Sequence, residues 1–159
     1  MGQKKAAFLW AGASLVCMVV IFVFSSFPAE QSSGMSNSFV DKPLALFEQW
    51  FGLAISFATR DFLHRLIRKA AHLLVFLLLG VCAANTVRQV TNKGKRVFLI
   101  SLCWCSFYAA TDEFHQYFIP GRSCMWQDWL LDTIGALIGI GGVLLFSRSR
   151  RAKAEKYSA

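Results

Sequence analysis

The 159-residue chain is 55% apolar, only 16% of its residues are charged, and 15 are phenylalanine. A water-soluble domain usually carries about 25% charged residues, so this composition argues against an ordinary soluble protein. It indicates an integral membrane protein, and the formal net charge of +8 has to be explained within that class.

Four apolar stretches are long enough to cross a membrane as helices, at about residues 6–25, 69–88, 97–118 and 126–146. A helical span needs roughly 20 residues, and the last two reach that length only with some of the acids between Thr111 and Asp132. The sequence therefore predicts an all-α, four-helix transmembrane bundle in one domain over residues 1–159. The first stretch is expected to stay as an anchor, because it is longer than the apolar core of a signal peptide.

Basic residues gather before the first stretch, between the second and third, and after the fourth. These segments hold Lys4, Lys5, Arg88, Lys93, Lys95, Arg96, Arg148, Arg150, Arg151, Lys153 and Lys156. The positive-inside rule then predicts a multi-pass protein of the bacterial cell membrane with both termini in the cytoplasm. The acid-rich stretch faces outward, and the net charge is explained by topology without a nucleic-acid partner.

A further apolar segment, residues 43–58, lies between the first and second stretches and is short for a span. Leu44, Phe47 and Phe51 recur at helical spacing, and Trp50 suits the depth of a membrane interface. We expect an interfacial helix in this outer loop. It would act either as a lid on the bundle or as an anchor on the membrane surface.

The second stretch is preceded by a cluster of basic and histidine side chains. His64, Arg68 and His72 are four residues apart, so a helix aligns them on one stripe, with Lys69 beside it. Arg65 is explained by snorkelling of its side chain to the interface. His72 lies about one turn inside the apolar stretch, where snorkelling is difficult.

The third stretch ends in polar residues that share a helical face. Asp112 lies three residues before His115 and four before Gln116, so the face presents an acid, an imidazole and an amide. Glu113 points about 100° away from it. Because this helix runs outward, all four side chains are expected at its outer end.

A Pro-Gly-Arg turn ending in Arg122 follows, and the planar guanidinium of arginine suits a phosphate or a carboxylate. Asp128 and Asp132 then share a face at the outer start of the fourth helix. The same stripe continues with small residues that allow close helix approach, namely Gly135, Gly139 and Gly142.

Placing an ionisable side chain in lipid costs free energy, so such side chains face the bundle interior and pair with one another. These features therefore predict that three helix ends meet in one polar pocket. The expected acid–base or catalytic residues are His72, Asp112, Glu113, His115 and Asp132. The expected substrate-binding residues are Arg68, Lys69, Gln116, Arg122 and Asp128. The basic residues are the expected ion-pair partners of the four acids.

The pocket has three interpretations. It is a polar clamp that fixes helix register, a metal or ion site, or a site for an anionic headgroup in which histidines and carboxylates move protons. The ligand types in His72, His115, Asp112 and Glu113 suit a metal, but no dense signature such as His-Glu-x-x-His occurs. We therefore expect no bound metal and no cofactor.

At these positions the sequence resembles the VanZ-like family. The resemblance covers about residues 21–146 and is carried by Arg68-Lys69-x-x-His72, Asp112-Glu113-x-His115-Gln116, Pro120-Gly121-Arg122 and Asp128-x-x-x-Asp132-x-x-Gly135. The "FSSFPAEQSS" segment after the first stretch is also similar. The resemblance implies a link to resistance against the glycopeptide teicoplanin, without implying a biochemical activity.

Three functions remain open. The protein is an enzyme that acts on a membrane lipid or a lipid-linked cell-wall precursor at the outer leaflet, with the basic residues gripping the headgroup. Alternatively, it is a non-enzymatic protein that binds a ligand or changes access to the cell surface. The third hypothesis is an ion-coupled carrier, which would need a homodimer because four spans are few for transport.

Overall fold

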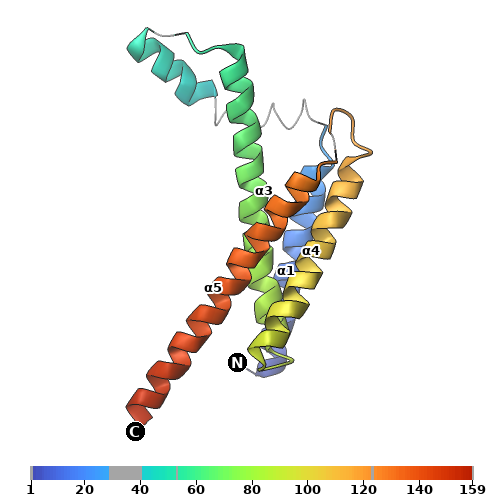
Figure 1. The fold of residues 1–159 in the computed structure, drawn as a ribbon, viewed down its shortest axis with the longest axis vertical. Helices are drawn as coiled ribbons and strands as arrows, with labels where there is room; N and C mark the ends of the chain where they lie inside the picture. The colour runs from blue at the N-terminus through green and yellow to red at the C-terminus, as the bar shows by residue number, and fades with distance from the viewer. Residues whose placement is uncertain (1, 29–40, 53, 123, 159) are drawn as a thin grey trace.

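The computed structural model describes residues 2–28, 41–52, 54–122 and 124–158. Its long helices are α1 (Gln3–Ser25), α3 (Phe57–Arg88), α4 (Gly94–Gln116) and α5 (Trp126–Ser158). All four are long and apolar enough to cross a membrane, and the described residues contain no strand (Figure 1). The prediction of an all-α bundle with four membrane-spanning helices and one shorter helix is confirmed.

The three basic segments lie at one end of the bundle. Figure 1 shows the start of α1, the turn from α3 to α4 and the C-terminal end of α5 at that end, which we call the basic end. The turn from α4 to α5 lies at the opposite end, which we call the site end. The chain therefore crosses the bundle four times with both termini on the same side, as the charge pattern requires.

Helix α3 begins earlier than the apolar pattern predicts. It starts at Phe57 with Ser56 as its N-cap, whose hydroxyl accepts from the Thr59 amide at 3.3 Å. Its 32 residues span about 48 Å at 1.5 Å per residue, well beyond the roughly 30 Å of a hydrocarbon core. The charged residues of its first turns hide this extension from a hydropathy pattern, although they are compatible with a helix.

Large apolar side chains lie on the outside of the bundle, and small ones fill much of the inside. Phe8 is 79% exposed and Phe107 is 73% exposed, which suits a surface in contact with lipid. The fully buried positions include Ala83, Ala84, Cys105, Ala109 and Ala136. Small residues let the helix backbones approach closely where lipid supplies no hydrophobic driving force between helices.

The closest approach joins α3 to α5. A Cβ atom on Gly139 would lie 2.2 Å from the Leu77 carbonyl oxygen, and a Cβ atom on Gly80 would be similarly close to α5. A Cβ atom on Gly135 would also clash with the α3 backbone, whereas a Cβ atom on Gly142 would meet nothing within 4 Å. The predicted stripe of small residues is therefore a helix contact at its first two positions and ends there. This crossing sets the register of α5 against α3.

The expected interfacial segment is a shorter helix than residues 43–58. Residues 41–51 are helical, and the helix ends at Gly52, which has φ 65° and donates its amide to the Glu48 carbonyl at 2.9 Å. Glycine is favoured here because other residues rarely adopt this left-handed conformation. Residue 53 lies outside the described part, and residues 57 and 58 belong to α3.

Ion pairs attach this short helix to the first turns of α3. Arg60 contacts Glu48 at 2.5 Å, His64 contacts Asp41 at 3.3 Å, and the Ile55 amide donates to Glu48 at 2.7 Å. In Figure 1 the helix stands beside the start of α3, away from the other three long helices.

The short helix also exposes apolar side chains, namely Leu46, Phe47, Trp50 and Phe51. Trp50 alone is 80% exposed. Exposed aromatic rings on a short amphipathic helix are typical of a segment lying in a membrane interface. The placement favours the surface-anchor interpretation over the lid.

Acidification is expected to release the short helix from α3. The Ile55 N–H and the Arg60 guanidinium stabilise the Glu48 carboxylate, so its pKa lies below the ordinary value of 4.5. The contact is therefore fully present above pH 4.5 and is lost as the pH falls through the lowered pKa. Hydrogen-exchange protection of the Ile55 amide should decrease in that window. Glu48→Leu, which has no acceptor for the Ile55 amide, should show low protection at every pH. Protection of the native protein that does not decrease at any pH below 4.5 would contradict the prediction.

Candidate functional site

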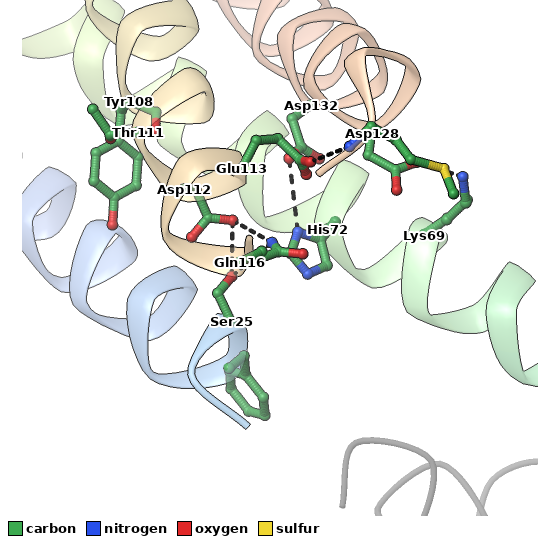
Figure 2. A network of polar contacts seen from close by, with 12 residues as sticks. Ser25, Lys69, His72, Tyr108, Thr111, Asp112, Glu113, Gln116, Asp128 and Asp132 are labelled. Carbon is green, nitrogen blue, oxygen red and sulfur yellow. Dashed lines mark hydrogen bonds and ion pairs between the residues drawn. The ribbon is translucent and has the colours of Figure 1, made fainter. Parts of the chain in front are cut away.

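Three helices and one turn bring polar side chains together at the site end. His72 comes from α3, Asp112 from α4 and Asp132 from α5, while Arg122 lies in the turn between the last two helices (Figure 2 shows the three helical residues). A cavity of about 290 Å³ lies beside them. It is lined by Phe62, Arg65, Leu66, Arg68, Lys69, His72, Glu113, Gln116, Gly121, Arg122, Met125, Asp128, Leu131 and Asp132.

The Asp112 carboxylate is held inside the bundle by two neighbouring side chains. The Ser25 hydroxyl donates to Asp112 Oδ2 at 2.8 Å, and the Gln116 amide donates to the same oxygen at 2.7 Å. The Gln116 amide also donates to Ser25 at 3.2 Å, and Asp112 is only 3% exposed. The predicted pairing of Asp112 with Gln116 on one helical face is observed. Ser25 was not among the predicted site residues, because its contact with Asp112 depends on how α1 packs beside α4.

His72 and Asp132 face each other across α3 and α5. The His72 Nδ1 atom lies 3.7 Å from Asp132 Oδ2, and Asp132 is 1% exposed (Figure 2). His72, Asp112 and Asp132 each offer one ligand atom, and these atoms lie within 4.8 Å of one another. The three expected helix ends therefore do meet at one level of the bundle.

Glu113 lies on a different side of α4 from Asp112, as the 100° separation predicts. Its Oε2 atom accepts from the Met125 amide at 3.0 Å, just before α5 begins. A carboxylate at a helix N-terminus satisfies a free amide and complements the helix dipole. Glu113 therefore fixes the start of α5 while also lining the cavity.

The basic residues do not pair with the acids as the sequence predicts, with one exception. Lys69 contacts Asp128, which is the expected type of ion pair. Arg122 instead donates to two backbone carbonyls, that of Phe24 in the last turn of α1 at 3.0 Å and that of Phe27 just beyond the helix at 3.1 Å. The charge pattern could not predict this contact, because the free backbone carbonyls at the end of a helix carry no formal charge.

Arg68 is half-buried and lines the cavity without an ion pair to any of the described residues. Burial lowers the pKa of Arg122 below its ordinary value, and the positive charge of Arg68 lowers it further. The two guanidinium groups therefore repel each other across the same cavity.

His115 lies outside the cavity. Its ring stacks on Phe22 of α1 at 4.7 Å between centroids, and its Nε2 lies 3.1 Å from the Ser26 hydroxyl. His115 lies three residues after Asp112 on α4, so its side chain points about 60° away from that of Asp112. Helix α1 packs against the side of α4 on which His115 lies. The sequence offers His72, His115, Asp112 and Glu113 as residues of metal-ligand type, without predicting a bound metal. The side chains that converge are His72, Asp112 and Asp132, and neither His115 nor Glu113 is among them.

The fold and the site define a multi-pass membrane protein in which helix ends enclose a charged cavity. The chain belongs to the VanZ/LLP1 family, whose family model matches residues 10–147. The match runs from within α1 to within α5, includes α3 and α4 entirely, and agrees with the resemblance in the sequence motifs. Membership links the protein to VanZ-type resistance. No curated protein and no solved structure matches the chain.

Proposed function

We propose that the cavity binds the anionic headgroup of a membrane lipid or of a lipid-linked cell-wall precursor, with the site end facing outward. The observation that carries the proposal is Arg68, a half-buried cation in the cavity that pairs with no acid among the described residues. A buried charge without a partner is costly. A phosphate between Arg68 and Arg122 would remove the repulsion between the two guanidinium groups and accept hydrogen bonds from both.

The size and the walls of the cavity support a headgroup as ligand. A volume of about 290 Å³ is at the lower end of the range for small-molecule sites, so it suits a headgroup better than a whole lipid. Phe62 and Leu66 line the cavity and are 57% and 50% exposed on α3. Their apolar surfaces offer a path along which acyl chains leave the headgroup site toward the membrane.

The His72–Asp132 pair is the candidate for chemistry on the bound headgroup. A carboxylate beside an imidazole fixes its orientation, and the imidazole then transfers a proton near neutral pH. Both residues line the same cavity as Arg68. The enzymatic and the purely binding forms of the proposal share the headgroup and differ only in whether this pair acts on it.

Replacing Arg68 by glutamine should weaken binding of an anionic lipid by about tenfold or more, since a hydrogen bond to a charged group contributes roughly 1.5–3 kcal/mol. The measurement is the affinity of full-length protein for phosphatidylglycerol in nanodiscs of otherwise zwitterionic lipid. Arg96→Gln is the matched control, because Arg96 is an exposed arginine in the first turn of α4 at the basic end. Equal affinities of native protein and Arg68→Gln would refute headgroup binding in this cavity.

Turnover is tested separately with Asp132→Asn, which keeps the shape of the side chain. Lipids and wall precursors extracted from cells that express the native protein would differ in headgroup from those of cells expressing the variant. If the lipids and precursors are identical in both kinds of cell and lipid binding is unchanged, the protein binds the headgroup without altering it. This result would exclude chemistry at the His72–Asp132 pair.

A further inference from the structure

We propose that His72, Asp112 and Asp132 form a binding site for one divalent transition-metal ion, with His72 and Asp132 at the cavity wall and Asp112 buried beyond the cavity lining. The three side chains come from α3, α4 and α5, so an ion there would join three successive helices of the bundle. The inference goes beyond headgroup binding and does not depend on it.

The spacing of the three side chains fits a single ion. Their ligand atoms lie within 4.8 Å of one another, and the His72 Nδ1 to Asp132 Oδ2 distance is 3.7 Å. Metal bonds of about 2.0–2.2 Å place neighbouring ligand atoms about 3–3.5 Å apart. Side-chain movements of about 1 Å therefore close the three residues around an ion.

An unsatisfied carboxylate oxygen points to the ligand independently of the spacing. Asp132 Oδ2 is buried, faces His72 and accepts no hydrogen bond from the described residues, and the whole residue is 1% exposed. Such a group costs several kcal/mol unless a cation compensates it. Lys69 pairs with Asp128, and Arg122 donates to backbone carbonyls. Arg68 lines the same cavity but forms no ion pair with Asp132 among the described residues. A metal ion would supply the missing positive charge.

The surroundings of Asp112 resemble the support that metal-binding carboxylates need. Ser25 and Gln116 both donate to Oδ2 and hold the carboxylate in one orientation. Its Oδ1 atom is buried and receives no hydrogen bond from the described part of the chain. Hydrogen-bonded outer partners of this kind orient ligands and raise metal affinity.

The ligand set indicates the kind of ion. One imidazole nitrogen with two carboxylate oxygens suits Zn²⁺ or Mn²⁺ better than ions that prefer thiolates. Two carboxylates cancel the charge of a divalent ion, which lowers the cost of placing it within a membrane helix bundle. Three protein ligands leave a coordination position free, and His72 and Asp132 both line the cavity from which a ligand would reach it.

Metal binding is measured on full-length protein purified without a polyhistidine tag, stripped with a chelator and titrated with Zn²⁺ or Mn²⁺. The expected result is one ion per chain for one of the two metals. Asp132→Asn and His72→Gln should each weaken binding at least about 100-fold, and Ser25→Ala should weaken it about tenfold through loss of an outer partner. Asp128→Asn is the matched control, because Asp128 shares the α5 face and lines the cavity but contacts Lys69.

The outcomes separate the possibilities. Absence of stoichiometric binding of either metal by the native protein would overturn the inference. Binding that persists unchanged in both Asp132→Asn and His72→Gln would place the ion elsewhere and would also overturn it. Size-exclusion profiles and helix content identify a variant that has not folded, and Ser25→Ala then provides the milder test. Headgroup binding is tested separately, by the effect of Arg68→Gln on phosphatidylglycerol affinity. Failure of the metal proposal and failure of the headgroup proposal can therefore be distinguished.

Discussion

Replacing Gly139 by alanine is expected to separate α3 from α5 and to destabilise the bundle by about 2–3 kcal/mol, the upper part of the range for overpacked cores. The added Cβ would lie 2.2 Å from the Leu77 carbonyl oxygen and 3.0 Å from the Val81 amide nitrogen. Both are backbone atoms, so no side-chain rotation can relieve the clash. The helix axes themselves have to move apart.

The measurement is the free energy of unfolding of the purified protein titrated with SDS in mixed micelles. Gly142→Ala is the matched control, because it lies on the same helix and a Cβ there meets nothing within 4 Å. Alanine favours a helix over glycine by roughly 1 kcal/mol, so the control variant should be as stable as the native protein or slightly more stable. Similar destabilisation of both variants would show that the close α3–α5 contact does not govern stability.

Replacing Arg122 by methionine is expected to cost about 2–3 kcal/mol, because two hydrogen bonds from a charged donor to the end of α1 are lost. Arg122 Nε donates to the Phe27 carbonyl and a terminal nitrogen donates to the Phe24 carbonyl. These bonds fasten the α4–α5 turn to α1 and satisfy a carbonyl in its last turn, where a positive charge also complements the helix dipole. The apolar stem of methionine retains packing but no donor.

Arg68→Met separates this structural role from the loss of positive charge in the cavity. Arg68 lines the same cavity and has no ion pair within the described ranges. Its replacement should leave the free energy of unfolding unchanged or raise it, because an unpaired charge is removed from the cavity, while reducing binding of anionic lipid. Thermal unfolding in detergent and phosphatidylglycerol affinity are measured for both variants. Equal stability of Arg122→Met and Arg68→Met would contradict the proposed fastening of the turn to α1.

The main features of the fold were predictable from local sequence because hydropathy is a local property. Four apolar stretches and three basic segments predict four helices with both termini on one side, and Figure 1 shows this arrangement. The start of α3 at Phe57 was not predictable from hydropathy, since its first turns carry charged residues. Those residues project beyond the other helices and bind the short helix at residues 41–51.

The candidate site was predictable in part. His72, Asp112 and Asp132 could be assigned to one level of the bundle because each lies near the same end of its helix. Their meeting, however, depends on the crossing of α3 and α5 at Gly135 and Gly139, which brings Asp132 opposite His72. His115 was predicted to share the pocket because it shares a face with Asp112, yet the position of α1 draws its ring to Phe22 and Ser26.

The sequence by itself determined the class of protein, the number of membrane-spanning helices and the residues at the site end, because composition, apolar length and charge position act locally along the chain. Only the tertiary structure decided which of these side chains face one another. Helical periodicity leaves the rotation of each helix and the partner on each side undefined. Packing of small residues between α3 and α5 determines the contact of Asp132 with His72. The backbone carbonyls at the end of α1 determine the contacts of Arg122.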